Sequence, residues 1–199
     1  MNTTTINFSI YEELIRNIQH QLPTTTPLIL AIDGMCGSGK TTLAQYLSTI
    51  FDASIIHMDN FFLPFERKTP ERLAEAGGNI DYERFLEIAV PALRQRRPFS
   101  YTAYNCQTAS YDRQIQITSC ELIIVEGSYS LHQKFGCYYD MSLFLSVDTE
   151  EQLRRLKIRC QNEAKFHRFQ TEWIPMETLY HEKQSVLHRA DMVINTTSL

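Results

Sequence analysis

The sequence lacks the usual features of a membrane or secreted protein. No apolar stretch approaches the roughly 18 residues that a membrane-spanning helix needs. The N-terminus, MNTTTINFSIYEELI, has neither a basic segment nor a continuous apolar one, so we expect no secretory signal peptide. The five cysteines are scattered and never in C-x-x-C spacing, which argues against a disulfide framework and a structural zinc site. A reducing, cytoplasmic location fits these absences.

An excess of positive charge is also missing. The chain has 23 acidic and 19 basic residues, so its net charge is −4, and we expect no large basic face for nucleic acid. Glycine is scarce, at 7 of 199 residues, yet three of the seven fall within residues 34–39. Glycine gives the backbone conformations that other residues avoid, so this short segment needs unusual freedom.

That segment belongs to the octapeptide GMCGSGKT, residues 34–41, which lies between an apolar run and a helical pattern. It matches G-x-x-x-x-G-K-[ST], the Walker A loop whose N–H groups converge on phosphate at a helix N-terminus. Lys40 would reach the terminal phosphates, and the Thr41 hydroxyl could bind Mg²⁺. The motif predicts a site for ATP and Mg²⁺ formed by Gly34, Gly37, Ser38, Gly39, Lys40, Thr41 and Thr42.

Strand and helix patterns alternate along the rest of the chain. Short buried runs typical of parallel strands occur at residues 28–33, 53–57, 121–127, 141–147 and 192–196. Helical periodicity fills most of the segments between them. The alternation predicts a single P-loop NTPase domain over 1–199, a three-layer α/β/α fold with a parallel central sheet.

Three segments fall outside the alternation. Residues 1–22 contain an amphipathic helix, with Ser9 and Glu12 in capping-box spacing at its start. Residues 99–118 alternate between polar and apolar side chains, which predicts a small projecting hairpin. A second copy of the chain could pack there and form a homo-oligomer. Residues from about 155 to 172 are a candidate lid. In the predicted helix 81–97, Pro91 should cause a kink or a division.

Charged side chains mark the expected ligand-binding edge of the sheet. Asp59 follows the second predicted strand, where it could accept the proton of an attacking hydroxyl, bind Mg²⁺, or simply cap the next segment. Glu126 ends the third strand and could hold Mg²⁺ or cap a turn. Arg155 and Arg159 share a helical face, so they could bind the transferred phosphoryl group or form a solvated surface.

Over about residues 28 to 195 the chain resembles the uridine kinase and phosphoribulokinase-like family of P-loop kinases. The resemblance rests on GMCGSGKTTLA, HMDNFF, GNIDYERF, IIVEGSYSL, VDTEEQLRRLKIR and RADMVINTT. It implies transfer of the γ-phosphate of ATP to a hydroxyl of a small molecule, with a uridine- or cytidine-like nucleoside as the first candidate. It also implies that Asp59 is the catalytic base and that Asp81 contacts sugar hydroxyls. The remaining residues that it assigns are Glu126 at the metal and Lys40, Arg155 and Arg159 in catalysis.

One segment departs from the family pattern. The family's base-binding stretch is of the YDFVTHSR type, and the nearest match here is AYNCQTAS. Tyr104 is retained and could stack on a ring, and Phe62 could form a wall of the acceptor pocket or simply fill the core. The family's aspartate, histidine and arginine are replaced, at Asn105, Ala109 and Tyr111. A site that reads a uracil edge needs matching donors and acceptors, so a pentose, or a vitamin or coenzyme precursor, is an alternative acceptor.

Two further functions stay open. A kinase for a nucleoside monophosphate or coenzyme precursor would need basic residues for a second phosphate, and Arg67, Lys68 and Arg72 could supply them. A nucleotide-binding switch or regulatory ATPase would have no small-molecule acceptor. The sequence has neither the N-K-x-D motif that reads guanine nor the L-S-G-G-Q motif of transporter ATPases. ATP turnover that depends on an added alcohol would distinguish a kinase from a regulatory ATPase.

Overall fold

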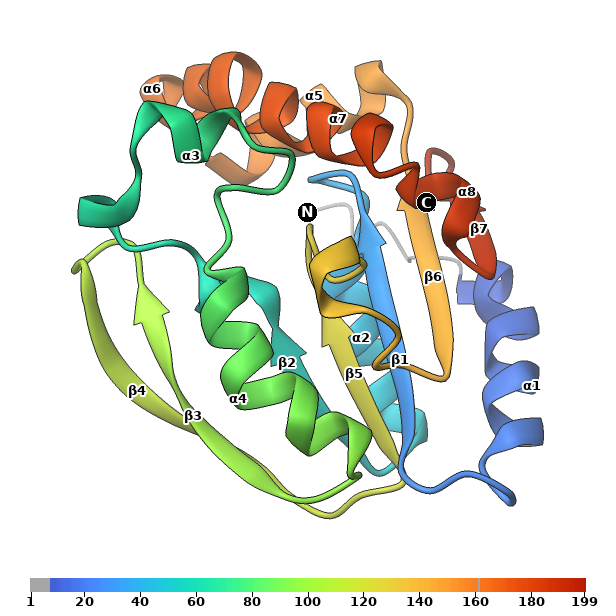
Figure 1. Cartoon of the computed structure of the whole chain (residues 1–199). Coiled ribbons are helices and arrows are strands. Elements are labelled where there is room, and N and C mark those ends of the chain that lie inside the picture. Colours follow the sequence, from blue (N-terminus) through green and yellow to red (C-terminus); the bar gives the residue numbers. More distant parts are fainter. Residues whose placement is uncertain (1–7, 161) are drawn as a thin grey trace.

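The computed structural model describes residues 8–160 and 162–199, which form a parallel sheet between two layers of helices (Figure 1). The strands of the sheet are β1 (Leu28–Gly34), β2 (Ala53–His57), β5 (Leu122–Glu126), β6 (Met141–Ser146) and β7 (Met192–Asn195). Their spatial order is β2-β5-β1-β6-β7, and every neighbouring pair is parallel. The predicted three-layer α/β/α fold is therefore confirmed.

The strand order determines where a ligand can bind. The chain places β2 and β5 on one side of β1 and places β6 and β7 on the other side. Ligands of open parallel sheets bind outside the carboxyl ends of the strands, at the point where the strand order changes direction. The glycine-rich loop follows β1 and therefore lies at this point.

Alternate side chains of β1 enter two separate cores. Ile29 packs into the core beneath α4 (Tyr82–Arg94), and Leu30 packs into the core beneath α1 (Glu12–Gln21) and α2 (Lys40–Ile50). Figure 1 shows α4 in front of the sheet and α2 behind it. Because both faces are covered, β1 is buried at every position, which explains why its sequence is continuously apolar before Asp33.

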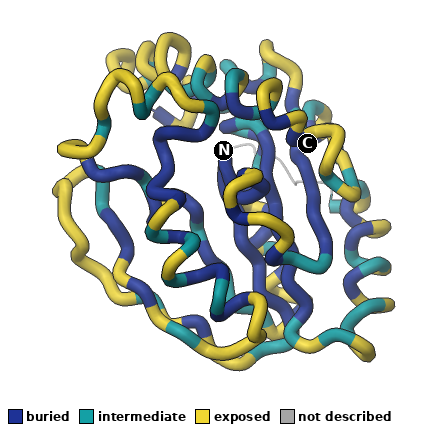
Figure 2. The backbone as a smooth tube through the Cα atoms, in the orientation of Figure 1, coloured by how far each residue is buried: buried dark blue, intermediate teal, exposed yellow. Residues whose placement is uncertain are grey.

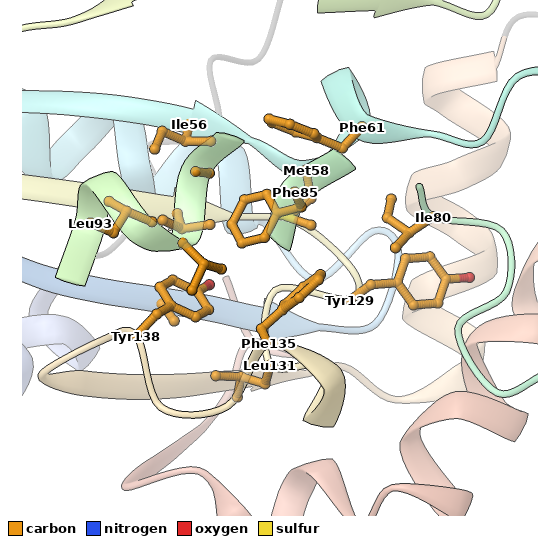
Figure 3. Packing of buried hydrophobic residues seen from close by; sticks show 14 of the residues in the cluster. Ile56, Met58, Phe61, Ile80, Phe85, Leu93, Tyr129, Leu131, Phe135 and Tyr138 are labelled. Carbon is orange, nitrogen blue, oxygen red and sulfur yellow. The ribbon is translucent and has the colours of Figure 1, made fainter. Parts of the chain in front are cut away.

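The core beneath α4 is rich in aromatic rings. The ring centroid of Phe85 lies 5.0 Å from that of Phe61, 4.5 Å from that of Phe135 and 5.5 Å from that of Tyr138. Figure 3 shows these rings together beside the sheet. Phe61 belongs to the 3-10 turn that carries Asp59, so the aromatic packing holds that turn in place.

Two predictions about helices need correction. Helix α1 begins at Glu12, with Tyr11 rather than Ser9 at the N-cap, because the buried Tyr11 ends a tighter 3-10 turn. Residues 1–7 of the predicted N-terminal segment lie outside the described residues. Helix α4 is not divided but runs through Pro91. The proline leaves the carbonyl of Glu87 without its helical partner, but Glu87 is exposed, so water can satisfy that carbonyl.

The remaining elements surround the carboxyl edge of the sheet. Strands β3 (Phe99–Asn105) and β4 (Ser110–Ile117) form the small antiparallel hairpin, and α5 to α7 pass over the strand ends (Figure 1). Figure 2 shows that the sheet is buried whereas much of the hairpin and of these helices is exposed. None of the described helices is long and apolar enough to span a membrane. The other helical elements are α3 (Pro70–Ala74), α5 (Thr149–Cys160), α6 (Glu163–Arg168), the π-helical turn Phe169–Trp173, α7 (Ile174–Lys183) and α8 (Val186–Arg189).

Asp33, near the end of β1, is a fully buried carboxylate. It accepts hydrogen bonds from the amides of Gly34 and Leu131, at 2.7 and 2.9 Å, and from the hydroxyl of Tyr180, at 2.7 Å. His181 Nε2 lies 3.6 Å from it. Burial alone would raise the pKa of Asp33, but His181 and these hydrogen bonds hold it below its usual value. Asp33 therefore ties β1 to the segment after β5 and to α7.

We expect Asp33→Asn to lower the free energy of unfolding by about 3 kcal/mol, because it breaks a buried charge network. The folded-state pKa of Asp33 is depressed, so its contribution is present above the unfolded-state pKa and is lost as the pH falls through the folded-state value. Urea unfolding from about pH 7 down to about pH 3 should therefore show a steeper acid-side loss in the wild type than in the variant. Parallel profiles would contradict this role.

Candidate active site

A cleft of about 1590 Å³ runs along the carboxyl edge of the sheet. Its walls come from the glycine-rich loop, the turn after β2, the end of β5, the tip of the hairpin and the helices α5 to α7. Pockets for one drug-sized ligand usually have about 300–1000 Å³. The cleft can therefore hold a nucleotide and a second small molecule side by side.

The loop between β1 and α2 depends on its glycines. Gly34 has a φ of +142°, and a Cβ atom there would lie 2.2 Å from the carbonyl oxygen of Leu145 in β6. Helix α2 begins at Lys40, so its N-terminus adds partial positive charge beside the loop. Ser38 is fully buried, and its hydroxyl group has no hydrogen-bond partner among the described residues. The predicted loop residues that line the cleft are Gly37, Ser38, Gly39, Lys40, Thr41 and Thr42.

Lys40 lies across the loop with its side chain mostly buried. Its Nζ donates to the carbonyl oxygens of Gly34 and Met35, at 2.7 and 3.0 Å. Its charge also lowers the pKa of Asp59, so the ammonium group is close to the loop and to that acid. A cation in this position can neutralise a phosphoryl group during its transfer.

The end of β5 provides oxygen donors suited to Mg²⁺. Thr41 Oγ1 donates to both carboxylate oxygens of Glu126 at 3.2 Å, and the charge of Glu126 helps to raise the pKa of Asp59. A divalent cation would relieve the repulsion between these two carboxylates. The described residues contain no cluster of three or more His, Cys, Asp or Glu side chains that could hold a metal ion. Phosphate oxygens and water would therefore complete the coordination shell, as is usual for Mg²⁺.

His57, the last residue of β2, is a second partner of Glu126. Its Nδ1 contacts Oε1 of the carboxylate closely. This hydrogen bond raises the pKa of His57 against the opposing effect of burial. Contacts from Thr41 and His57 together fix the orientation of Glu126, as outer-shell partners do for metal ligands.

Asp59 is an exposed residue that lines the cleft. Partial desolvation by the walls of the cleft raises the pKa of Asp59, and the charge of Glu126 acts in the same direction, whereas Lys40 and Arg159 lower it. The carboxylate of Asp59 accepts no hydrogen bond from any residue that the structure describes. An acid with free oxygens and a raised pKa is suited to accept a proton from a bound hydroxyl group.

Comparisons with known proteins agree with this geometry. No family model matches the chain. A uridine kinase of Ureaplasma parvum serovar 3 is 24% identical over 161 residues, which cover 75% of this chain and 78% of that protein. The structure of a possible uridine kinase from Bacillus stearothermophilus aligns with a TM-score of 0.65 at 23% identity, over 92% of this chain and 99% of its own. D-glycerate 3-kinase from Cryptococcus neoformans aligns with a TM-score of 0.63 at 12% identity, over 94% of this chain and 96% of its own.

The chain has the P-loop kinase fold. The resemblance to uridine kinase-like P-loop kinases that the motifs predicted is confirmed. The P-loop kinase fold requires the glycine-rich loop to lie at the carboxyl end of β1, and the cleft residues described above occupy that edge.

Arg155 is held by partners from three segments of the chain. It makes five hydrogen bonds, so its guanidinium group has no further N–H to offer a ligand. Its acceptors are Glu151, the carbonyl of Gly37, two oxygens of Thr196 and the carbonyl of Leu199. Arg155 therefore ties α5 to the P-loop and to the C-terminal segment. It also lines the cleft, so the predicted contact with a phosphoryl group would require it to exchange one of these partners.

Arg159, one helical turn later, is exposed and lines the cleft. Its guanidinium carbon lies 5.9 Å from the ring centroid of Phe169, and it has no hydrogen-bond or ion-pair partner among residues 8–160 and 162–199. Its charge lowers the pKa of Asp59. Of the two predicted lid arginines, Arg159 is the one whose charge is available to a phosphoryl group.

Asp81 is also placed differently from the prediction. Its carboxylate caps α4 by accepting the amide of Arg84 at 3.2 Å, and it binds the guanidinium group of Arg67 at 2.8 Å. It is 1% exposed and does not line the cleft. An N-cap with an ion pair is a structural role, so Asp81 is not positioned to contact a sugar. The predicted Tyr104 and Phe62 do line the cleft, on the side of the hairpin.

Glu177 of α7 is a cleft residue that sequence reasoning missed. Its buried carboxylate accepts the amide of Cys36 in the P-loop at 2.8 Å and the hydroxyl of Ser128 at 2.7 Å. It therefore links the C-terminal helices to the loop. Asn79 and Tyr129 also line the cleft unpredicted. No local pattern identifies these residues, because only the folded chain brings α7 and the loops after α3 and β5 beside the P-loop.

Proposed function

We propose that the protein is an ATP-dependent phosphotransferase that moves the γ-phosphoryl group of ATP to a hydroxyl group of a small metabolite. The observation that carries the proposal is Asp59, a free carboxylate with a raised pKa that shares one cleft with Lys40 and the P-loop. The similarity to a uridine kinase of Ureaplasma parvum supports the same reaction type.

The residues divide the work of transfer. The P-loop and the start of α2 bind the triphosphate, and Thr41 with Glu126 would hold Mg²⁺, which neutralises phosphate charge when bound. Asp59 accepts the proton of the acceptor hydroxyl group while the oxygen of that hydroxyl group bonds to the γ-phosphorus. The bond from phosphorus to the bridging oxygen breaks, and ADP leaves. Lys40 and Arg159 stabilise the charge on the phosphoryl group during this step.

The helices above the cleft would limit hydrolysis of ATP. Phe169 packs edge-on against Trp173, with ring centroids 4.4 Å apart, in a small apolar cluster that also contains Leu156 of α5. Both rings line the cleft. An apolar cover keeps water away from the γ-phosphate, so that the acceptor hydroxyl is the nucleophile that reaches it.

A nucleoside is the first candidate acceptor, because the curated relative is a uridine kinase. The ring of Tyr104 could stack on its base, and Asn79 and Tyr129 could bind its hydroxyl groups. Other hydroxylated metabolites, such as a pentose or a vitamin precursor, are the alternative. The cleft continues past Asp59 to the tip of the hairpin, which favours an acceptor site over a regulatory ATPase without one.

The test is release of ADP from ATP and Mg²⁺ in the presence of nucleosides, sugars and vitamin precursors. We expect one class of acceptor to raise ADP release many-fold, and mass spectrometry should then detect the phosphorylated acceptor. Release of ADP at one slow rate throughout, with an equal amount of inorganic phosphate, would contradict a kinase and favour a regulatory ATPase.

A further inference from the structure

The segment between β2 and α4 carries three basic residues, but only one of them is available to a ligand. Arg67 binds Asp81 at 2.8 Å and Glu83 at 3.3 Å. Arg72 binds Glu83 at 2.7 Å and also donates to Tyr82 and to two backbone carbonyls. The guanidinium groups of Arg67 and Arg72 are therefore already paired with other protein groups, and neither residue lines the cleft.

Lys68 is the exception. It lines the cleft and is partly buried, with its ammonium 5.0 Å from the ring centroid of Phe65. Its ammonium group makes no ion pair and no hydrogen bond within the described part of the chain. Burial lowers the pKa of this ammonium group. The charge of Glu172 offsets only part of this effect. A partly desolvated cation without a direct acid partner costs free energy, and an anionic ligand would recover it.

A second cation approaches Lys68 from the helices above the cleft. Arg168 at the end of α6 lines the cleft and is close enough to lower the pKa of Lys68 further. Its own acid, Glu172, is 3.0 Å away, and both side chains are about half exposed. Two like charges from separate elements repel each other, so an anion between them would stabilise the approach of the helices to the loop.

Lys68 lines the same cleft as Asp59, the proposed catalytic base. Cys106 lies at the tip of the hairpin, and burial raises the pKa of its thiol. The charge of Asp59 raises this pKa further, whereas the charge of Lys68 lowers it. The charges of Lys68 and Asp59 therefore both act on one side chain. Asp59, Lys68 and Cys106 line the same cleft, so one small molecule that spans it would place a hydroxyl group at Asp59 and an anionic group at Lys68.

In the segment that would read a neutral base, Asn105 has no free amide, whereas the Gln107 side chain lines the cleft without a hydrogen-bond partner among the described residues. Asn105 Nδ2 donates to Asp112 at 2.7 Å, and Asn105 Oδ1 accepts the amide of Gln107 at 2.9 Å. The hydroxyl of Tyr104 accepts the amide of Phe65 at 3.3 Å. The tip of the hairpin therefore uses part of its polar groups on itself. Among the described residues, the ammonium of Lys68 is unpaired in the cleft, as are the guanidinium group of Arg113 in β4 and the side-chain amide of Gln107.

We propose that the acceptor carries an anionic group, a carboxylate or a phosphate, which Lys68 binds while the reacting hydroxyl group lies at Asp59. This inference rests on the proposed kinase function and narrows its substrate class from any hydroxylated metabolite to a hydroxylated anion. Lys68 is then a specificity-determining residue, because a neutral acceptor would leave its charge partly desolvated and unpaired.

The test uses acceptors in matched sets: glycerol with glycerate and glycerol phosphate, and ribose with ribonate and ribose 5-phosphate. Comparing the carboxylate and phosphate members identifies the anion. We expect an anionic member to have the highest kcat/KM, by at least about 10-fold. In Lys68→Gln, the KM for that acceptor should rise about 10- to 100-fold, the usual effect of losing a hydrogen bond to a charged group.

Lys157→Gln is the matched control, because Lys157 is exposed on α5 outside the cleft and its loss changes the net charge equally. Calorimetric titration with ATP checks that both variants are folded. The inference would be overturned if a neutral acceptor had a kcat/KM equal to that of its anionic partner, or if Lys68→Gln changed the KM of both acceptors equally. Neither result would contradict the proposed kinase function. ADP release that no acceptor raises would instead refute the kinase and the inference together.

Discussion

Asp59→Asn is expected to abolish acceptor-dependent ADP release while ATP still binds. The amide cannot take the proton that the attacking hydroxyl must lose, and general-base catalysis contributes about 10²- to 10⁴-fold to rate. The variant should therefore lose at least about 10²-fold in kcat with its best acceptor. Its affinity for ATP, measured by calorimetry, should change little, because the P-loop and Lys40 make the main phosphate contacts in the proposed complex.

The pH dependence provides a second check on Asp59. The base must be ionised to work, and its pKa is raised by partial desolvation in the cleft and by Glu126. Activity should therefore fall as the pH decreases through a value above that of an ordinary carboxyl group, and kcat/KM should show this acid limb. Asp52→Asn is the control, since Asp52 is exposed ahead of β2 and outside the cleft. Equal losses in the two variants, or an unchanged rate in Asp59→Asn, would remove Asp59 from the mechanism.

Gly34→Ala is expected to have the largest effect on stability. The new Cβ would lie 2.2 Å from the carbonyl oxygen of Leu145 and 2.8 Å from its amide nitrogen, at a φ of +142°. Relieving this overlap requires β1 and β6 to separate, which also breaks the hydrogen bond from the Met35 amide to the Leu145 carbonyl. We expect the free energy of unfolding to fall by about 3 to 5 kcal/mol and ATP binding to be lost.

Gly39→Ala separates the clash from the backbone strain. Gly39 has a φ of +93°, but a Cβ atom there would meet nothing within 4 Å. This variant should lose only about 1 to 2 kcal/mol, the usual cost of a left-handed conformation at a residue with a side chain. Urea unfolding of both variants gives the comparison. Similar losses in the two would mean that the contact between Gly34 and Leu145 does not govern the stability of the loop.

Some of these features follow from the sequence alone. The Walker A motif predicted the loop, because its glycines and lysine are consecutive and have meaning only as a local unit. The continuous apolar runs predicted the parallel sheet, because burial on both faces leaves no polar alternation. Asp59 and Glu126 were identified because each directly follows or ends such a strand, and strand ends meet at one edge.

The tertiary structure decided what each charged side chain does. Arg155 and Arg159 are equivalent in the sequence and both line the cleft, yet Arg155 donates to the C-terminal segment whereas Arg159 has no hydrogen-bond partner among the described residues. Asp81 was predicted to bind substrate and instead caps α4. Unlike Arg67 and Arg72, Lys68 lines the cleft and has no acid partner in the described structure. Glu177 binds a loop 141 residues away. A side chain's role depends on which partners fill its hydrogen bonds, and those partners come from distant segments that only the folded chain brings together.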